Sequence, residues 1–169
     1  MKRWFALAVN LLLAVLVIAG GVLIKRRAEA ARSTRPLFLV LSGEKTGKVY
    51  GEWEAPEGTE FAVEFIHSVN NTPVREMFRV EGGVIRAEAA RFFSFGAGMQ
   101  STLEGEERLV RDGEGMIITG LTRTYGELNY IVGTVSDHVL FIGDERVGLR
   151  DLCGKNAHVV FRIRTGGGK

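Results

Sequence analysis

Apolar and polar residues alternate along most of the chain after residue 36. Two clear examples are "TEFAVEFIH" at residues 59–67 and "HVVFRIR" at residues 158–164. Turn-forming residues interrupt such runs about every eight to twelve positions, which is typical of antiparallel sandwiches and barrels. Because a period of two places successive side chains on opposite faces of a strand, the pattern predicts an all-β domain. We expect an antiparallel β-sandwich or partly open β-barrel over residues 37–165.

Short turns join several of these runs. "EGG" at residues 81–83, "DGEG" at 112–115 and "GD" at 143–144 each separate two apolar segments and predict β-hairpins. The run "VIRAEAARFF" at residues 84–93 is ambiguous, because Ala, Glu and Arg also favour a helix. Its tight turn from the preceding run favours a strand.

The N-terminal region has a different pattern. Residues 4–24, "WFALAVNLLLAVLVIAGGVLI", contain no charged side chain. About 20 apolar residues suffice for a helix to span a bilayer, so residues 1–24 are predicted to form a transmembrane anchor in the lipid bilayer. A cleaved signal peptide is the alternative, with "AEA" at 28–30 as its cleavage site, but signal cores usually run only about 7 to 15 residues. Residues 25–36 then form a basic linker, and residues 166–169 a disordered tail.

Charge is distributed unevenly between the two parts. Seven Lys and Arg and one acid precede residue 37, whereas the remainder has 15 bases against 19 acids, a net charge of −4. An acidic domain argues against nucleic-acid binding, and the basic residues beside the apolar segment suit lipid headgroups. The positive-inside rule would place the domain in the cytoplasm, whereas an early apolar segment acting as a signal anchor would export it. The residues alone leave the orientation open.

Cysteine chemistry offers little. The single cysteine, Cys153, excludes an internal disulfide and a multi-thiolate metal site. In "LRDLCGK" it suits a small buried hydrophobe better than a nucleophile. We expect no metal and no cofactor.

The stretch "FIHSVNNTPVREMF" at residues 65–78 places a histidine, a serine and a glutamate around one loop. If Phe65 faces Phe78 across an antiparallel pair, His67 faces Glu76, about 4.5 to 5.5 Å away at Cβ. Ser68 follows His67 in the strand and points to the other face, so the two cannot form a nucleophile and base pair. We interpret His67 and Glu76 as a polar clasp around the loop, with a ligand-binding or hydrolytic site as the alternative.

Other polar positions extend that alternative. His138, in "SDH", could join the cluster of His67, Ser68 and Glu76, but no local ligand spacing such as His-x-x-x-His indicates a metal site. The segment "FFSFGAGM" at 92–99 lacks the rest of a nucleotide-binding motif, and its two glycines favour a bulge or tight corner. The candidate contact residues in these two loops are Asn70, Asn71, Pro73, Gly96, Gly98 and Met99.

Four stretches, in order, carry a resemblance. "FIHSVNNTPVREMFRV", "FFSFGAGM", "VGTVSDHVL" and "AHVVFRIR" together resemble the prokaryotic family called domain of unknown function 1850, over nearly all of residues 37–164. The family-like positions are His67, Ser68, Pro73, Glu76, Gly96, Gly98 and His138.

The resemblance implies a short membrane-anchored or exported β-rich protein encoded beside TAXI-type tripartite ATP-independent periplasmic (TRAP) transporters. It supplies no catalytic residue. The resulting expectation is a single-pass protein of the cell membrane with an extracytoplasmic β-domain. This domain would act without enzymatic activity as an accessory to the transporter's membrane subunit or solute-binding protein.

Overall fold

The computed structural model describes residues 35–69, 71–94 and 102–166. The chain divides into two compact units, residues 1–35 and 36–169, and the fold described below belongs to the second. Within the described ranges no helix is both long and apolar enough to cross a membrane. The predicted anchor at 4–24 and nearly all of the predicted linker lie outside those ranges, as do residues 167–169 of the predicted tail.

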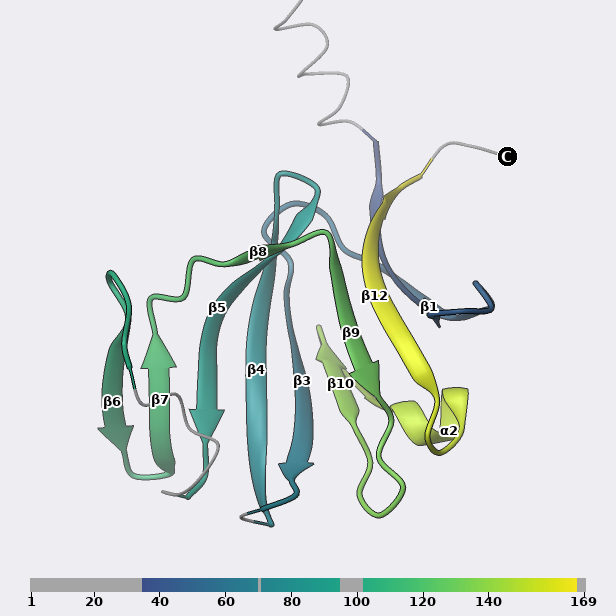
Figure 1. Cartoon of the computed structure of the whole chain (residues 1–169). Coiled ribbons are helices and arrows are strands. Elements are labelled where there is room, and N and C mark those ends of the chain that lie inside the picture. Colours follow the sequence, from purple (N-terminus) through teal and green to yellow (C-terminus); the bar gives the residue numbers. More distant parts are fainter. Residues whose placement is uncertain (1–34, 70, 95–101, 167–169) are drawn as a thin grey trace, which may run out of the picture. The chain divides into compact units, whose positions relative to one another are not determined.

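The described part of the domain consists of antiparallel strands and one short helix (Figure 1), which confirms the all-β prediction. One sheet has four strands in the order β2-β1-β12-β9. The other has eight, in the order β11-β10-β3-β4-β5-β7-β6, with β8 pairing with β5. The elements are β1 (Leu37–Gly43), β2 (Val49–Glu54), β3 (Glu60–His67), β4 (Thr72–Glu81), β5 (Val84–Phe92), β6 (Arg108–Asp112), β7 (Gly115–Thr119), β8 (Thr124–Tyr125), β9 (Glu127–Ile131), β10 (Val139–Ile142), β11 (Glu145–Gly148), α2 (Leu149–Cys153) and β12 (His158–Thr165).

Both sheets contribute to one hydrophobic core. Leu39 and Leu41 from β1 and Phe161 from β12 are fully buried, as the alternation in their strands predicts. Phe61 of β3 stacks on Phe78 of β4, with ring centroids 5.3 Å apart, and its centroid lies 6.4 Å from that of Phe161. Each such side chain contributes about 1.5–3 kcal/mol through burial. The two sheets therefore pack as the layers of a sandwich.

The three predicted hairpins are present, and residues 84–92 form a strand rather than a helix. At the β4–β5 turn, Gly82 and Gly83 have φ of 63° and 74°, a region that glycine adopts without steric cost. Their N–H groups both donate to the Glu57 carboxylate, each at 2.8 Å. These two hydrogen bonds hold the turn that precedes β5.

The predicted register of the β3–β4 hairpin is wrong. Phe61, not Phe65, lies opposite Phe78, and His67 lies opposite Thr72 instead of Glu76. The loop closes earlier than expected, because the Asn71 N–H donates to the His67 carbonyl at 2.9 Å and Asn71 adopts a φ of 51°. The displacement is four residues, an even number, so every inward side chain keeps its predicted face.

Candidate ligand-binding pocket

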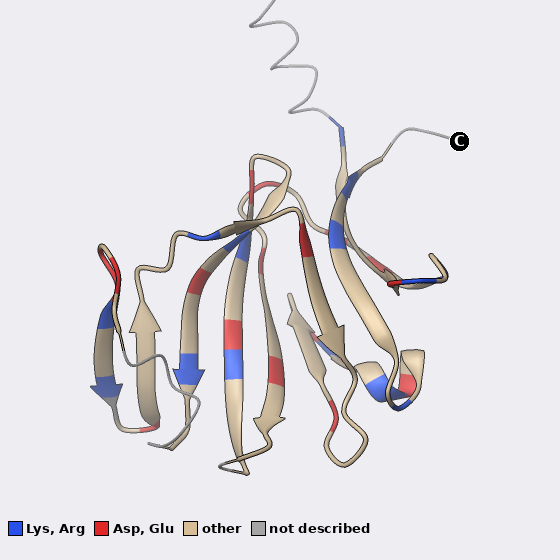
Figure 2. Cartoon of the chain, in the orientation of Figure 1, with Lys and Arg blue, Asp and Glu red and all other residues tan. Residues whose placement is uncertain are grey.

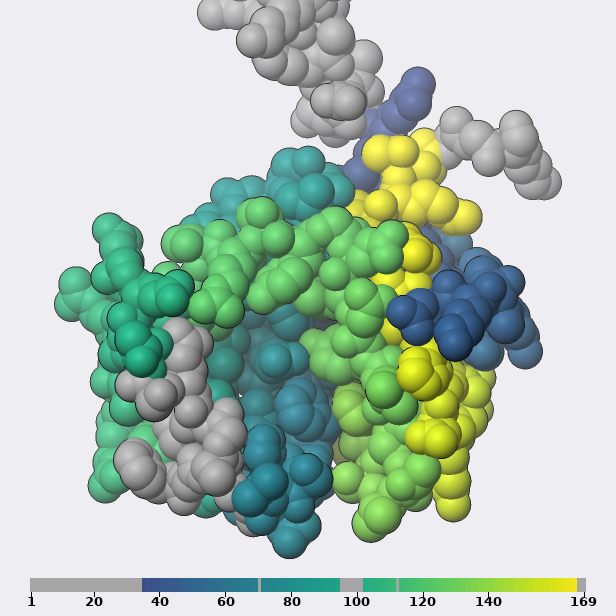
Figure 3. Space-filling model, viewed as in Figure 1, coloured from purple at the N-terminus to yellow at the C-terminus, as the bar shows by residue number. Residues whose placement is uncertain are grey.

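A pocket of about 710 Å³ lies against the inner face of the large sheet. Strands β3, β4, β5 and β7 form its floor, and the chain from Leu121 to Tyr130 forms its upper rim and one wall. Figure 3 shows the molecule hollowed beneath this green segment. A volume of this size lies within the range of about 300–1,000 Å³ that small-molecule sites occupy.

Small residues on β5 create the space. Ala90 stands between Glu76 of β4 and Ile118 of β7, its two register partners, both of which line the pocket. Ala87, opposite Phe78, also belongs to the lining. Larger side chains at these positions would fill the hollow, so the sequence itself keeps it open. Further apolar surface comes from Phe65, Val74, Phe92, Leu121, Tyr125 and Leu128.

One polar pair crosses the pocket between the two sheets. The Tyr130 hydroxyl, on β9, donates to Oε2 of Glu76, on β4, at 2.6 Å. Burial, and next the neighbouring carboxylate, raise the pKa of Tyr130 well above its ordinary value. The phenol therefore stays protonated, as a donor to Glu76 should.

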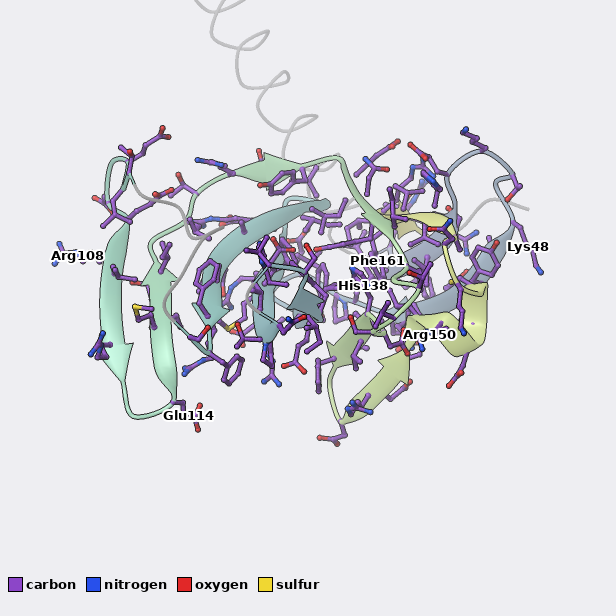
Figure 4. All side chains as sticks on the ribbon, turned by 60° about the horizontal axis from the view of Figure 1, so that its bottom comes forward. Lys48, Arg108, Glu114, His138, Arg150 and Phe161 are labelled. Atoms are coloured by element: carbon purple, nitrogen blue, oxygen red, sulfur yellow. The ribbon has the colours of Figure 1, made fainter. Side chains whose placement is uncertain are left out.

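His138 supports the wall behind this pair. Its ring stacks on Phe65 at 5.3 Å between centroids and meets the edge of Tyr130 at 5.8 Å. Nδ1 accepts the Gly133 N–H at 3.2 Å, and burial lowers the pKa of His138. Figure 4 labels His138 in the interior, amid side chains from both sheets. The neutral imidazole therefore holds two pocket-lining rings, and His138 is not itself among the lining residues.

A brace at helix α2 fixes the loop that carries His138. Asp137 Oδ1 accepts the Arg150 N–H at 2.8 Å, and the Leu149 N–H donates to the His138 carbonyl at 2.8 Å. The Arg150 guanidinium donates in turn to the Gly133 carbonyl at 3.3 Å. These bonds tie both ends of residues 133–138 to the helix, so the position of His138 is set from outside the pocket.

The other predicted site residues are spread over this end of the domain. His67 lines the pocket at the end of β3, and its Nδ1 accepts the Val69 N–H at 3.3 Å. Ser68 and Asn71 are exposed in the turn, and Pro73 pairs with Ile66 within the hairpin. Asn70, Gly96, Gly98 and Met99 lie outside the described residues. His67 and Glu76 thus do not face one another, yet both belong to the same pocket.

Cys153 and the possible metal-binding side chains were the remaining candidates for a functional site. The Cys153 thiol packs against the core, and burial raises its pKa to about 11, which keeps it protonated at neutral pH. Among the residues that the structure describes, no group of three His, Cys, Asp or Glu side chains could hold a metal ion.

Sequence reasoning did not single out Tyr130 or the alanines of β5. Alternation alone could place Tyr130 on a face but could not reveal that its hydroxyl reaches a carboxylate on the other sheet. The alanines did carry a usable signal, since a strand with small residues on its inward face leaves a space that its neighbours must fill or leave open.

A family model described as "Domain of unknown function (DUF1850)" matches residues 61–149, just over half of the 169-residue chain. The chain belongs to the DUF1850 family. The matched segment of this DUF1850 protein runs from β3 to the first residue of α2 and includes the Glu76–Tyr130 pair and His138. Searches of curated proteins and of solved structures gave no match.

Proposed function

We propose that this domain binds a small organic molecule in the pocket beside Glu76 and Tyr130, without enzymatic turnover. The observation that carries the proposal is the pocket itself, a hollow of about 710 Å³ with an alanine floor and one internal carboxylate–phenol pair. Mostly apolar walls with few polar groups are the usual composition of such sites. A domain that needed this region only for packing would gain stability by filling it.

The test is ligand-induced stabilisation of the full-length chain in a mild detergent. A fragment library containing amines, alcohols and carboxylates is screened by thermal unfolding, followed through intrinsic fluorescence. A ligand that binds only the folded state raises the midpoint in a saturable manner. We expect such fragments for the wild-type chain and for Thr119→Leu, which places a leucine on β7 outside the pocket.

The Ala90→Leu variant should lose this response, because its side chain occupies the space between Glu76 and Ile118. If no fragment stabilises the wild type, or if Ala90→Leu responds equally, the proposal is overturned.

A second proposal concerns the partner of the domain. We propose that it serves as an accessory to a TAXI-type TRAP transporter, on the extracytoplasmic side of the cell membrane and tethered by residues 4–24. The supporting observation is a pair of exposed apolar tips, Val69 at 65% and Val135 at 92% exposure. Both loops lie at the end of the domain away from the start of β1 and the end of β12 (Figure 1). Exposed apolar side chains at loop tips suit contact with another protein.

Protease treatment of intact cells or spheroplasts tests the side of the membrane. Digestion of the domain from outside is the expected result, and protection until lysis would contradict it. Cross-linking from positions 69 and 135 tests the partner. Recovery of the transporter's membrane subunit or solute-binding protein from these positions, but not from Val49 at the opposite sheet edge, would support the accessory role.

A further inference from the structure

The charges that border the pocket are unequally compensated. Glu127 at the wall pairs with Arg162 at 2.8 Å, and Arg123 at the rim pairs with Glu104 at 3.6 Å. Glu76 differs, because the described residues provide it with no basic partner and its hydrogen bond there comes from the Tyr130 hydroxyl. One carboxylate therefore faces the hollow without a countercharge from the described chain.

Glu76 is a partly buried carboxylate that lines the pocket. Moving a carboxylate out of water is unfavourable unless it is paired and hydrogen-bonded. The Tyr130 hydroxyl satisfies part of this requirement at Oε2. A ligand that brought a positive charge and N–H donors to Glu76 would satisfy the rest, whereas a ligand carboxylate there would add repulsion.

Aromatic side chains surround the same space. Phe65, Phe92 and Tyr125 line the pocket together with Phe78 and Tyr130. The face of an aromatic ring attracts an organic cation, most strongly where water is excluded. Figure 2 shows acidic and basic positions along the strands of the large sheet. Arg75 and Arg79 lie on the outer face, away from the pocket, where they pair with Glu64 and with Glu60 and Glu88.

From the Glu76 carboxylate and the rings around it, we infer that the pocket recognises an organic cation with an apolar body, such as a protonated primary amine. The inference rests on the proposed ligand-binding function and names the chemical class of the ligand. The ammonium group donates to Glu76 beside Tyr130, and the apolar body lies over the alanine floor. His67 also lines the pocket, and its Nδ1 accepts the Val69 N–H.

Three probes of one shape test this inference: 2-phenylethylamine, 2-phenylethanol and 3-phenylpropanoate. Their affinities for the full-length chain are measured by isothermal titration calorimetry at neutral pH. We expect the amine to bind at least about tenfold more tightly than the alcohol, since charge-assisted hydrogen bonds are markedly stronger than neutral ones. The carboxylate should bind most weakly.

The decisive variant is Glu76→Gln, which keeps an acceptor for Tyr130 but removes the charge. It should weaken amine binding about tenfold and leave alcohol binding within about threefold. Glu64→Gln is the matched control, because it makes the same change on the outer face of the same hairpin, where Glu64 pairs with Arg75 at 2.6 Å. This control should leave all three affinities unchanged.

The outcomes distinguish the choice of a cationic ligand from ligand binding itself. If the alcohol or the carboxylate binds as well as the amine, or if Glu76→Gln leaves the amine preference intact, the cation inference is overturned while ligand binding stands. If none of the three probes binds and the fragment screen also yields no ligand dependent on Ala90, both fall. Tyr130→Phe provides a second variant, which should retain the amine preference because Glu76 keeps its charge.

Discussion

The inner face of the large sheet has two halves that follow the same alternation but pack differently. Where β1 and β12 cover it, Phe61 packs against Phe78 and Phe161 in the hydrophobic core. Farther along the sheet, Ala87 and Ala90 occupy equivalent inward positions and a pocket results. Binary pattern therefore determines which face points inward, whereas side-chain volume determines whether that face becomes core or cavity.

Removing a large side chain from the covered half should have the largest effect. Phe161 is completely buried between the sheets, so Phe161→Ala removes a ring that Phe61 and Tyr130 both contact. We expect a loss of about 3–5 kcal/mol in the free energy of unfolding, from lost burial and the cavity left behind. Denaturant unfolding measures it. A loss below about 1 kcal/mol would show that this half is not the tightly packed one.

The bond that joins the two sheets across the pocket should come next. Tyr130→Phe removes the hydroxyl that donates to Glu76 but retains the ring contacts with His138 and Phe161. Hydrogen bonds to charged groups contribute about 1.5–3 kcal/mol, so we expect a loss of that order by denaturant unfolding. Tyr125→Phe is the control, because Tyr125 lines the pocket without sharing this bond with Glu76. Equal losses in both variants would remove the special role of the pair.

Adding the same bulk to the hydrophobic core and to the pocket gives a direct contrast. Ala55 is completely buried in the core, and Ala55→Leu should cost about 1–3 kcal/mol through overpacking. Ala90→Leu adds its methyl groups to an existing hollow, so we expect a change within about 1 kcal/mol or a small gain. Thermal and denaturant unfolding of both variants measure the difference. Equal destabilisation would mean that the pocket closes in solution.

Much of the fold could be predicted because each strand carries its own evidence. The alternation in "TEFAVEFIH" placed Phe61 and Val63 on one face, and "EGG" placed the β4–β5 turn, both as observed. The family was identifiable from motifs, and the family model confirms it over residues 61–149. Register could not be predicted in the same way, because the β3–β4 loop length depends on the Asn71 backbone and shifted the pairing by four residues.

The site was predictable only in part for a related reason. His67, Glu76 and His138 were recognisable as unusual polar residues near apolar strands, and the structure brings all three to one region. The position of Glu76 depends on Tyr130 of β9, which lies 54 positions away in the sequence. The position of His138 depends on the bonds from Arg150 of α2 to Asp137 and Gly133. The alternating pattern contains no information about such contacts, and the wrong hairpin register separately led to the pairing of His67 with Glu76.

The smallest expected effect concerns the pH dependence of stability at the pocket wall that His138 supports. Burial among Phe65 and Tyr130 lowers the pKa of His138 below its ordinary 6.5, although Asp137 opposes this. The unfolded chain therefore takes up this proton more readily than the folded one. The contribution of His138 to stability is full above the unfolded pKa and is lost as pH falls through the folded pKa. Protonation at Nδ1 would also end its hydrogen bond from the Gly133 N–H.

Unfolding free energies of the wild type and His138→Gln, compared from about pH 8 to about pH 5, measure this dependence. We expect the wild type to lose more stability than the variant over that interval, because the glutamine does not titrate. His158→Gln is the matched control, since His158 is exposed on β12 and contacts Glu44 instead of the pocket wall. Parallel pH profiles for wild type and His138→Gln would show that His138 does not make the pocket wall sensitive to pH, and would leave the Glu76–Tyr130 bond as the principal polar link between the two sheets at the pocket.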